Sequence, residues 1–204
     1  MAARGERVGV FGGTFDPPHL GHAIVANDLV EQLDLDRLLV IPAPRPPHRS
    51  AVLSAETRLS LIRKLFEGAS SIEVDEREFE RAGPSFAVDT LDELRREYPE
   101  ADLTMVIGAD QLAAIDEWHD YRRLPELATI AVMRRDGEEP TLPDAAAGLR
   151  YIAVDVTRID LAASAIRDRL RTGRSIRFLV PESIRTDIER AWAARGADQM
   201  GTDA

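Results

Sequence analysis

The feature that most constrains the fold of this 204-residue chain is a repeated alternation of short apolar runs with longer amphipathic segments. The apolar runs predict strands over residues 8–11, 37–41, 71–75, 103–107, 129–133 and 151–154. Helical periodicity predicts helices over residues 20–33, 54–67, 86–98, 161–172 and 181–194, with two shorter helices flanking Trp118. Such an alternation predicts an α/β fold: a Rossmann-like, doubly wound, mostly parallel sheet with helices on both faces.

The length and the 44% hydrophobic content fit one domain, which we expect over residues 1–196. Residues 197–204 are expected to form a frayed tail. Residues 43–50, with three prolines, and residues 135–149, rich in Asp, Glu, Pro and Ala, are typical of loops. In a parallel α/β sheet, ligands bind at the carboxyl ends of the strands, so the loops that follow the strands are the first place to look for a site.

The segment Gly9–His22 joins the first predicted strand to the first predicted helix and ends in two closely spaced histidines. Gly12 and Gly13 allow the backbone to approach a ligand closely. His19 and His22 lie three residues apart near the helix N-terminus, where free N–H groups and the helix dipole favour anions. This segment therefore predicts a phosphate site.

Two other interpretations of the histidine pair are open: the rings cap or pack the first helix, or they bind a metal as His-x-x-His. Zinc needs further ligands, but His48 and His119 lie in different predicted loops and the chain has no cysteine. The sequence also lacks a G-x-G-x-x-G after a strand, and its one lysine, Lys64, does not follow a Walker A pattern. Phosphate contact through imidazoles is the favoured interpretation.

The formal net charge of −10 argues against a nucleic-acid partner and against binding to an anionic membrane. It does not exclude an anionic substrate, because salt screens distant charges over roughly 8 Å. The absence of cysteine excludes disulfides and thiolate chemistry. With neither a signal peptide nor an apolar run of roughly 20 residues, a cytoplasmic location is expected. Association of identical chains is compatible with this composition.

The string Gly12–His22, GGTFDPPHLGH, resembles the signature loop of the bacterial nicotinate-nucleotide adenylyltransferase family, and weaker similarities run from near residue 7 to near residue 190. The resemblance implies transfer of the adenylyl group of ATP to nicotinate mononucleotide, with release of pyrophosphate. We expect His22 to contact the transition state and His19 to bind phosphate. Mg²⁺ is expected to accompany ATP, held mainly by substrate oxygens and water.

Two further motifs belong to the phosphate side of this resemblance. Pro46–Arg49 is similar to a family loop that usually ends in lysine, and its alternative interpretation is a proline-rich surface turn. Leu161–Arg167 aligns with a family segment in which serines stand at the positions of Ala162 and Ala163, so weaker ATP binding is expected; alternatively it is an ordinary amphipathic helix. The implied ATP and phosphate site consists of Gly12, Gly13, Thr14, Phe15, Arg49, Ser164, Ile166 and Arg167.

The acceptor side is implied by Arg81–Leu91, which resembles the family's Gly-Pro-Ser-Tyr-Thr segment with Phe86 and Ala87 in place of Tyr and Thr. The resemblance places nicotinate against Ser85, Phe86, Ala87 and Trp118, and the nucleotide or its ribose against Gly108, Asp110 and Arg134. The local alternatives are that Ser85 and Asp110 cap helices and that Trp118 belongs to the core.

Three other functions stay open. Nicotinamide mononucleotide is an alternative acceptor, because it differs from nicotinate mononucleotide by one carboxylate that backbone amides can bind. Phosphopantetheine is less favoured, since that family usually has threonine at the position of His19. A nucleotide-binding regulator without catalysis is supported by Ala162 and Ala163 alone.

Overall fold

The computed structural model describes residues 5–48, 50–134 and 139–200 of the chain. Its centre is a six-stranded sheet with the order β3-β2-β1-β4-β5-β6, in which every neighbouring pair is parallel. The strands are β1 Arg7–Gly13, β2 Arg37–Pro42, β3 Ile72–Val74, β4 Asp102–Gly108, β5 Thr129–Arg134 and β6 Ile152–Asp155. The predicted Rossmann-like α/β fold and all six predicted strands are confirmed.

The five long helices occur where periodicity predicts them: α1 Leu20–Gln32, α2 Ala55–Leu65, α4 Ala87–Glu97, α7 Ala163–Arg171 and α8 Glu182–Met200. Trp118 is flanked by 3₁₀ turns at Ile115–Glu117 and Tyr121–Arg123, in agreement with the two short helices predicted there. A third 3₁₀ turn, Asp144–Ala146, lies in the segment predicted as a loop. Helices α3 Arg77–Glu80, α5 Ala109–Leu112 and α6 Leu124–Leu127 were not predicted, because one helical turn is too short to show a period.

A side chain caps the start of α2, whereas the starts of α4 and α7 have no side-chain cap. The Ser54 hydroxyl caps α2 by accepting a hydrogen bond from the Thr57 N–H at 3.1 Å. Helix α8 continues to Met200 and so includes residues 197–200, where the sequence predicts the start of a frayed tail. Alanines and other good helix formers continue through this segment and tolerate the single Gly196. Residues 201–204 lie outside the described residues.

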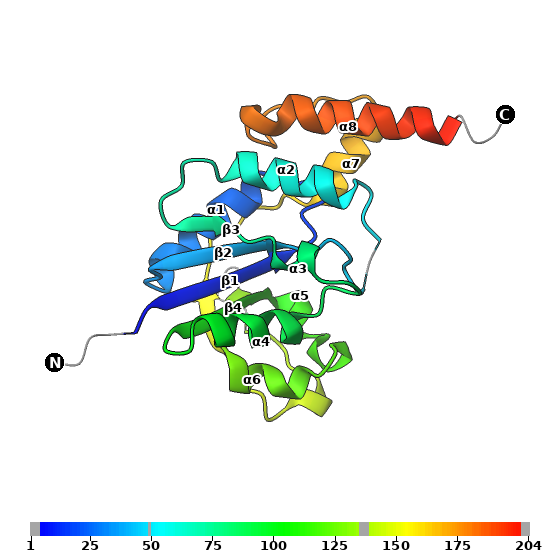
Figure 1. The fold of residues 1–204 in the computed structure, drawn as a ribbon. Helices are drawn as coiled ribbons and strands as arrows, with labels where there is room; N and C mark the ends of the chain where they lie inside the picture. Colours follow the sequence, from blue (N-terminus) through cyan, green and yellow to red (C-terminus); the bar gives the residue numbers. More distant parts are fainter. Residues whose placement is uncertain (1–4, 49, 135–138, 201–204) are drawn as a thin grey trace.

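Both faces of the sheet are covered, as Figure 1 shows with α1 and α2 on one side and α4 and α6 on the other. Alternate residues of each strand point to opposite faces. Val8 and Val10 therefore pack with α4 and α6, whereas Phe11 packs with α1 and α2. A third cluster joins α2 to α7 and α8 through residues such as Leu61, Ile166 and Ile184.

Strand β1 lies at the centre of the sheet and packs closely on the chain that follows α1. A Cβ at Gly9 would lie 2.5 Å from Leu35 Cδ1 and 2.8 Å from Leu38 Cδ1, so a larger residue there would require these two side chains to move. Strand β1 pairs with β2 on one side and β4 on the other, which makes its carboxyl end the point where the strand order reverses. This crevice is the expected ligand site of a doubly wound sheet. Within the described ranges, no helix combines the length and apolar character that crossing a bilayer requires.

Candidate active site

The predicted phosphate segment occupies the crevice at the carboxyl end of β1. His19 is the N-cap residue of α1, with extended backbone angles of φ −150° and ψ 173°, and His22 lies one turn into the helix. Their rings stack with centroids 3.8 Å apart and an interplanar angle of 28°. The two imidazoles thus lie together, as a spacing of three residues along a helix allows.

The orientation of each ring is fixed by its neighbours. His22 Nδ1 accepts a hydrogen bond from the His19 backbone N–H at 3.1 Å, and the Phe15 ring packs edge-on against His22 with centroids 4.9 Å apart. Phe15 holds this place with a φ of 49°, in the left-handed region that is strained for a bulky side chain. A Cβ at Gly21 would lie 3.0 Å from His19 Nδ1 and Cε1, so glycine leaves room for the stacked pair.

Burial keeps both imidazoles neutral in the free protein. Desolvation lowers the pKa of His19 from 6.5 to about 4, and it also lowers the pKa of His22, with a further contribution from His19. Because His22 Nδ1 accepts a hydrogen bond, the proton of the neutral ring resides on Nε2. His19 Nδ1 is buried without a hydrogen-bond partner among the described residues. The pair thus offers one oriented N–H donor and one unsatisfied ring nitrogen.

The lowered pKa of His19 predicts a loss of stability in acid. The unfolded chain binds this proton near pH 6.5, whereas the folded chain binds it near pH 4. Between these values the unfolded state holds more protons, so the free energy of unfolding rises with pH and falls as the solution is acidified. The contribution of His19 amounts to at most about 3 kcal/mol. Urea unfolding at pH 7 and pH 4.5 measures it.

In that measurement the His19→Asn variant is expected to lose about 2 to 3 kcal/mol less than the wild type on acidification. The matched control is His119→Asn, because His119 is exposed and its removal leaves the buried ring in place. An equal loss in the wild type and in His19→Asn would show that burial of His19 does not oppose its protonation.

Arg58, which the sequence did not single out, ties the loops of the crevice together. It is 1% exposed and lies in the first turn of α2. Its guanidinium donates hydrogen bonds to four backbone carbonyls: Thr14 and Ala43 at 2.7 Å, Pro44 at 3.1 Å and Leu53 at 3.3 Å. The loop after β1 and the loop after β2 are therefore held at a fixed separation. A basic residue in an amphipathic helix gives no sequence signal of this role.

Asp16 completes this internal framework. Its buried carboxylate accepts hydrogen bonds from the N–H groups of Val52 at 2.6 Å and Leu53 at 2.9 Å. Burial lowers the pKa of Arg58, and the negative charge of Asp16 acts in the opposite direction. Asp16 lies inside the signature string. Its hydrogen bond to Val52 joins residues 36 positions apart, so the sequence alone does not indicate this role.

The N-terminus of α1 is less open than the sequence suggests. The Leu20 N–H donates to the Leu179 carbonyl at 3.2 Å, and the His22 N–H donates to the His19 carbonyl at 3.0 Å. Two of the N–H groups expected to bind phosphate are therefore already bonded.

The residues predicted from α7 divide into two groups. Arg167 Nη1 donates to the Asp16 carbonyl at 2.6 Å and lies 3.8 Å from its carboxylate, so the structure brings Arg167 to the signature loop. Ser164 is exposed beside it. Ile166, in contrast, is fully buried in the cluster of α2, α7 and α8, and its N–H is bonded to the Ala162 carbonyl. Neither the side chain nor the backbone N–H of Ile166 is available to a ligand, because the helical repeat points this residue into the core.

The loop after β2 lines an open pocket. This pocket of about 580 Å³ is lined by residues 44–47, Leu53, Arg58, Gly83 and Pro84, among others. Gly12 is exposed, Gly13 and Thr14 are half-buried, and the Gly13 carbonyl accepts from the Ala43 N–H at 2.9 Å. Arg49, predicted to contact phosphate, lies outside the described residues.

The predicted acceptor residues gather at the start of α4. Phe86 is the N-cap residue of this helix, so Ser85 does not cap it; the Ser85 hydroxyl instead accepts from the Arg45 N–H at 3.3 Å. The Phe86 ring stacks on His119 with centroids 4.3 Å apart. Trp118 packs against the core cluster while its ring faces His48 with centroids 6.5 Å apart. Phe86, Ala87 and Trp118 are all half-buried, as expected of residues that line a site.

The residues predicted near the ribose lie at the ends of β4 and β5. Gly108 precedes α5 and donates its N–H to Gln111 at 2.8 Å; Asp110 is exposed in the same turn. Arg134 pairs with Asp155 at 2.6 Å and with Glu139 at 2.9 Å, so its guanidinium is engaged by two carboxylates that the sequence did not connect to it. Among the residues described by the structure, no three His, Asp or Glu side chains converge as a metal site.

Comparisons with known proteins agree with this geometry. The Cytidylyltransferase-like family model matches residues 10–169. A curated protein of Gemmatimonas aurantiaca, named "Probable nicotinate-nucleotide adenylyltransferase", is 44% identical over 89% of this chain and 89% of its own length. A protein of the same name from Thermus thermophilus is 39% identical over 90% of this chain and 97% of its own.

A solved structure shares the fold at much lower sequence identity. The Plasmodium falciparum nicotinic acid mononucleotide adenylyltransferase complexed with NaAD superposes with a TM-score of 0.73 and 15% identity, covering 94% of this chain and 98% of that one. The family resemblance drawn from the signature loop is thus confirmed by relatives that span nearly the whole chain. This chain belongs to the bacterial nicotinate-nucleotide adenylyltransferase family.

Proposed function

We propose that this protein transfers the adenylyl group of ATP to nicotinate mononucleotide in NAD biosynthesis. The 5′-phosphate oxygen of the mononucleotide attacks the α-phosphorus of ATP, a new P–O bond forms, and the bond to the β-phosphate bridging oxygen breaks to release pyrophosphate. The observation that carries this proposal is the stacked His19–His22 pair at the point where the strand order reverses.

Catalysis in this proposal rests on positioning and charge stabilisation, without a protein nucleophile. The Nε2–H of His22 donates to the oxygens of the α-phosphate as negative charge builds there. His19 binds phosphate, and the anionic triphosphate raises its pKa from the low value of the free protein. Arg167, already at the signature loop, adds positive charge beside the same oxygens. We expect Arg49 to supply further positive charge to the phosphates.

The acceptor binds along the start of α4. The pyridine ring lies against Trp118 and Phe86, and its carboxylate approaches the N-terminus of α4, where backbone donors favour an anion. Asp110 is exposed at the end of β4 and is placed to accept hydrogen bonds from a ribose. Because backbone amides tolerate changes of side chain, Phe86 and Ala87 are compatible with this use.

Mg²⁺ is proposed to arrive with ATP. The donor set fits a substrate-borne ion, since Asp16, the buried carboxylate of the signature string, is occupied by two backbone N–H groups. When bound, the ion neutralises charge on the triphosphate. A cytoplasmic location stays a prediction from the sequence.

Pyrophosphate release tests the proposal. Purified protein with MgATP is expected to release pyrophosphate rapidly with nicotinate mononucleotide and much more slowly with nicotinamide mononucleotide or phosphopantetheine. A preference for either of the other acceptors would replace the proposed substrate. ATP binding without release of pyrophosphate in any of these mixtures would instead support a nucleotide-binding regulator without catalysis.

The alanines at the start of α7 predict that ATP binding can be improved. Ala162 is the N-cap residue of α7 and its side chain makes no capping bond. We expect Ala162→Ser or Ala163→Ser to lower the apparent Kd for ATP, because a hydroxyl beside the phosphates adds a donor worth about 1 kcal/mol. Calorimetric titration measures the Kd, and Ala165→Ser, one turn further along at an exposed position, is the control. Unchanged affinity in both variants would show that the missing hydroxyls do not limit ATP binding.

A further inference from the structure

Glu78 is a buried carboxyl that the proposed chemistry does not use. It lies in the one-turn helix α3 and is 8% exposed. Its Oε1 accepts a hydrogen bond from the Thr90 hydroxyl at 2.6 Å, while Oε2 is buried without a hydrogen-bond partner in the described part of the chain. Burial raises the pKa of this carboxyl, and the nearby hydroxyls of Thr90 and Ser85 and the Arg81 charge lower it. A buried, half-satisfied carboxyl costs stability, so its presence calls for another reason.

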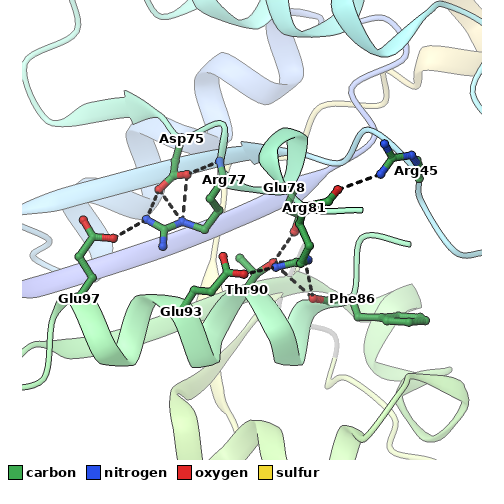
Figure 2. Close-up of polar contacts among 9 residues, drawn as sticks. All are labelled: Arg45, Asp75, Arg77, Glu78, Arg81, Phe86, Thr90, Glu93 and Glu97. Atoms are coloured by element: carbon green, nitrogen blue, oxygen red, sulfur yellow. Dashed lines mark hydrogen bonds and ion pairs between the residues drawn. The ribbon is translucent and has the colours of Figure 1, made fainter. Parts of the chain in front are cut away.

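The partners of Glu78 converge on the first turn of α4, as Figure 2 shows. The Thr90 hydroxyl, which donates to Glu78, also accepts a hydrogen bond from Arg81 Nη2 at 3.0 Å. The same nitrogen lies 3.4 Å from the Phe86 carbonyl, and Arg81 Nη1 pairs with Glu93 at 2.9 Å. Side chains from α3 and from residue 81 therefore clamp the end of α4 that carries Phe86.

The clamp continues into the loop that follows β2. The Ser85 N–H donates to the Arg45 carbonyl at 2.9 Å, and the Arg45 N–H donates to the Ser85 hydroxyl at 3.3 Å. Arg45 Nη1 also donates to the carbonyls of Arg81 and Gly83, each at 3.0 Å. Residues 81–86 are thus fixed on one side by Glu78 and Thr90 and on the other by Arg45.

We propose that Glu78, acting through Thr90, is a positioning residue for the acceptor mononucleotide: it holds the Ser85–Ala87 segment where the pyridine ring binds. The inference rests on the proposed function of that segment. Within the described residues, Glu78 makes no hydrogen bond or ion pair to the signature loop or to α7, so we expect ATP binding not to depend on it. The clamp belongs to the acceptor half of the site.

Steady-state kinetics with each substrate varied in turn test this assignment. In Glu78→Ala and in Thr90→Val, the KM for nicotinate mononucleotide is expected to rise roughly tenfold or more, since small misplacements of binding groups have large effects. The KM for ATP and kcat are expected to stay close to wild type. Thr90→Ser keeps the hydroxyl that bonds Glu78 and is expected to restore the wild-type KM.

Two controls separate positioning from general destabilisation. Asp92→Ala removes a carboxylate from the same helix that pairs with Arg123 away from the clamp, and it is expected to change neither KM. Amide hydrogen exchange is expected to accelerate at residues 83–88 in Glu78→Ala and Thr90→Val, without faster exchange in the central strands. This measurement needs no turnover.

The outcomes are distinct. An unchanged KM for the mononucleotide in a folded Thr90→Val protein overturns the assignment, as does a loss of kcat and of both affinities together. Should Glu78→Ala fail to fold, Thr90→Val and Thr90→Ser decide the matter. If the wild type shows no turnover, the proposed function fails, and exchange at residues 83–88 still decides whether Glu78 holds the segment.

Discussion

The His22→Asn variant is expected to lower kcat about 10²–10³-fold, the effect typical of removing one donor to the transition state. Asparagine is the informative replacement because its amide oxygen can take the place of Nδ1 and accept the His19 N–H. The variant therefore keeps the bond that closes the first turn of α1 and loses the Nε2–H. A lower kcat then results from the loss of the Nε2–H donor rather than from damage to the helix.

The measurement is kcat with both substrates saturating, together with thermal unfolding to show that the variant is folded. Asn27→Ala is the matched control, since Asn27 lies on the same helix and bonds to Glu31 on its exposed side. It is expected to leave kcat unchanged. Wild-type turnover in folded His22→Asn would exclude transition-state contact by Nε2 and would move the catalytic donor elsewhere in the crevice.

The elements that the sequence predicted well are those whose signal is local and repeated. The apolar residues Val8, Val10 and Phe11 predict strand β1. The alternation of strands and helices predicts that it belongs to a parallel sheet. The stacked histidines were predictable because a spacing of three residues at a helix N-terminus places two side chains on one face. In such cases the length of a segment and its hydrophobic pattern are sufficient to predict its structure.

What the sequence could not predict depends on contacts between distant segments. Arg58 resembles any polar residue of an amphipathic helix until α2 packs over the loops after β1 and β2. Glu78 resembles a surface residue of an acidic turn until α4 covers it. The pairing of Arg134 with Asp155 requires β5 and β6 to lie side by side. Burial of a charge is a property of the packed structure and leaves no periodic trace in the chain.

The largest stability effect is expected for Arg58→Met, with a loss of about 3 to 5 kcal/mol in the free energy of unfolding. Methionine fills a similar volume, so the change leaves little cavity and isolates the hydrogen bonds. Four carbonyls, those of Thr14, Ala43, Pro44 and Leu53, lose a charged donor, and buried acceptors without partners are costly. Urea unfolding at pH 7 measures the loss.

Arg63→Met is the matched control, because Arg63 lies on the same helix but pairs with Glu76 at the surface. Exposed ion pairs contribute about 0 to 1 kcal/mol, so this variant is expected to be nearly as stable as the wild type. A loss in Arg58→Met no larger than in Arg63→Met would mean that the four carbonyls find other donors. If the loss is large, the KM for both substrates should also rise, since Arg58 joins the loop that precedes the histidines to the loop that lines the pocket. The stability of the fold and the binding of both substrates would then depend on the same side chain, Arg58.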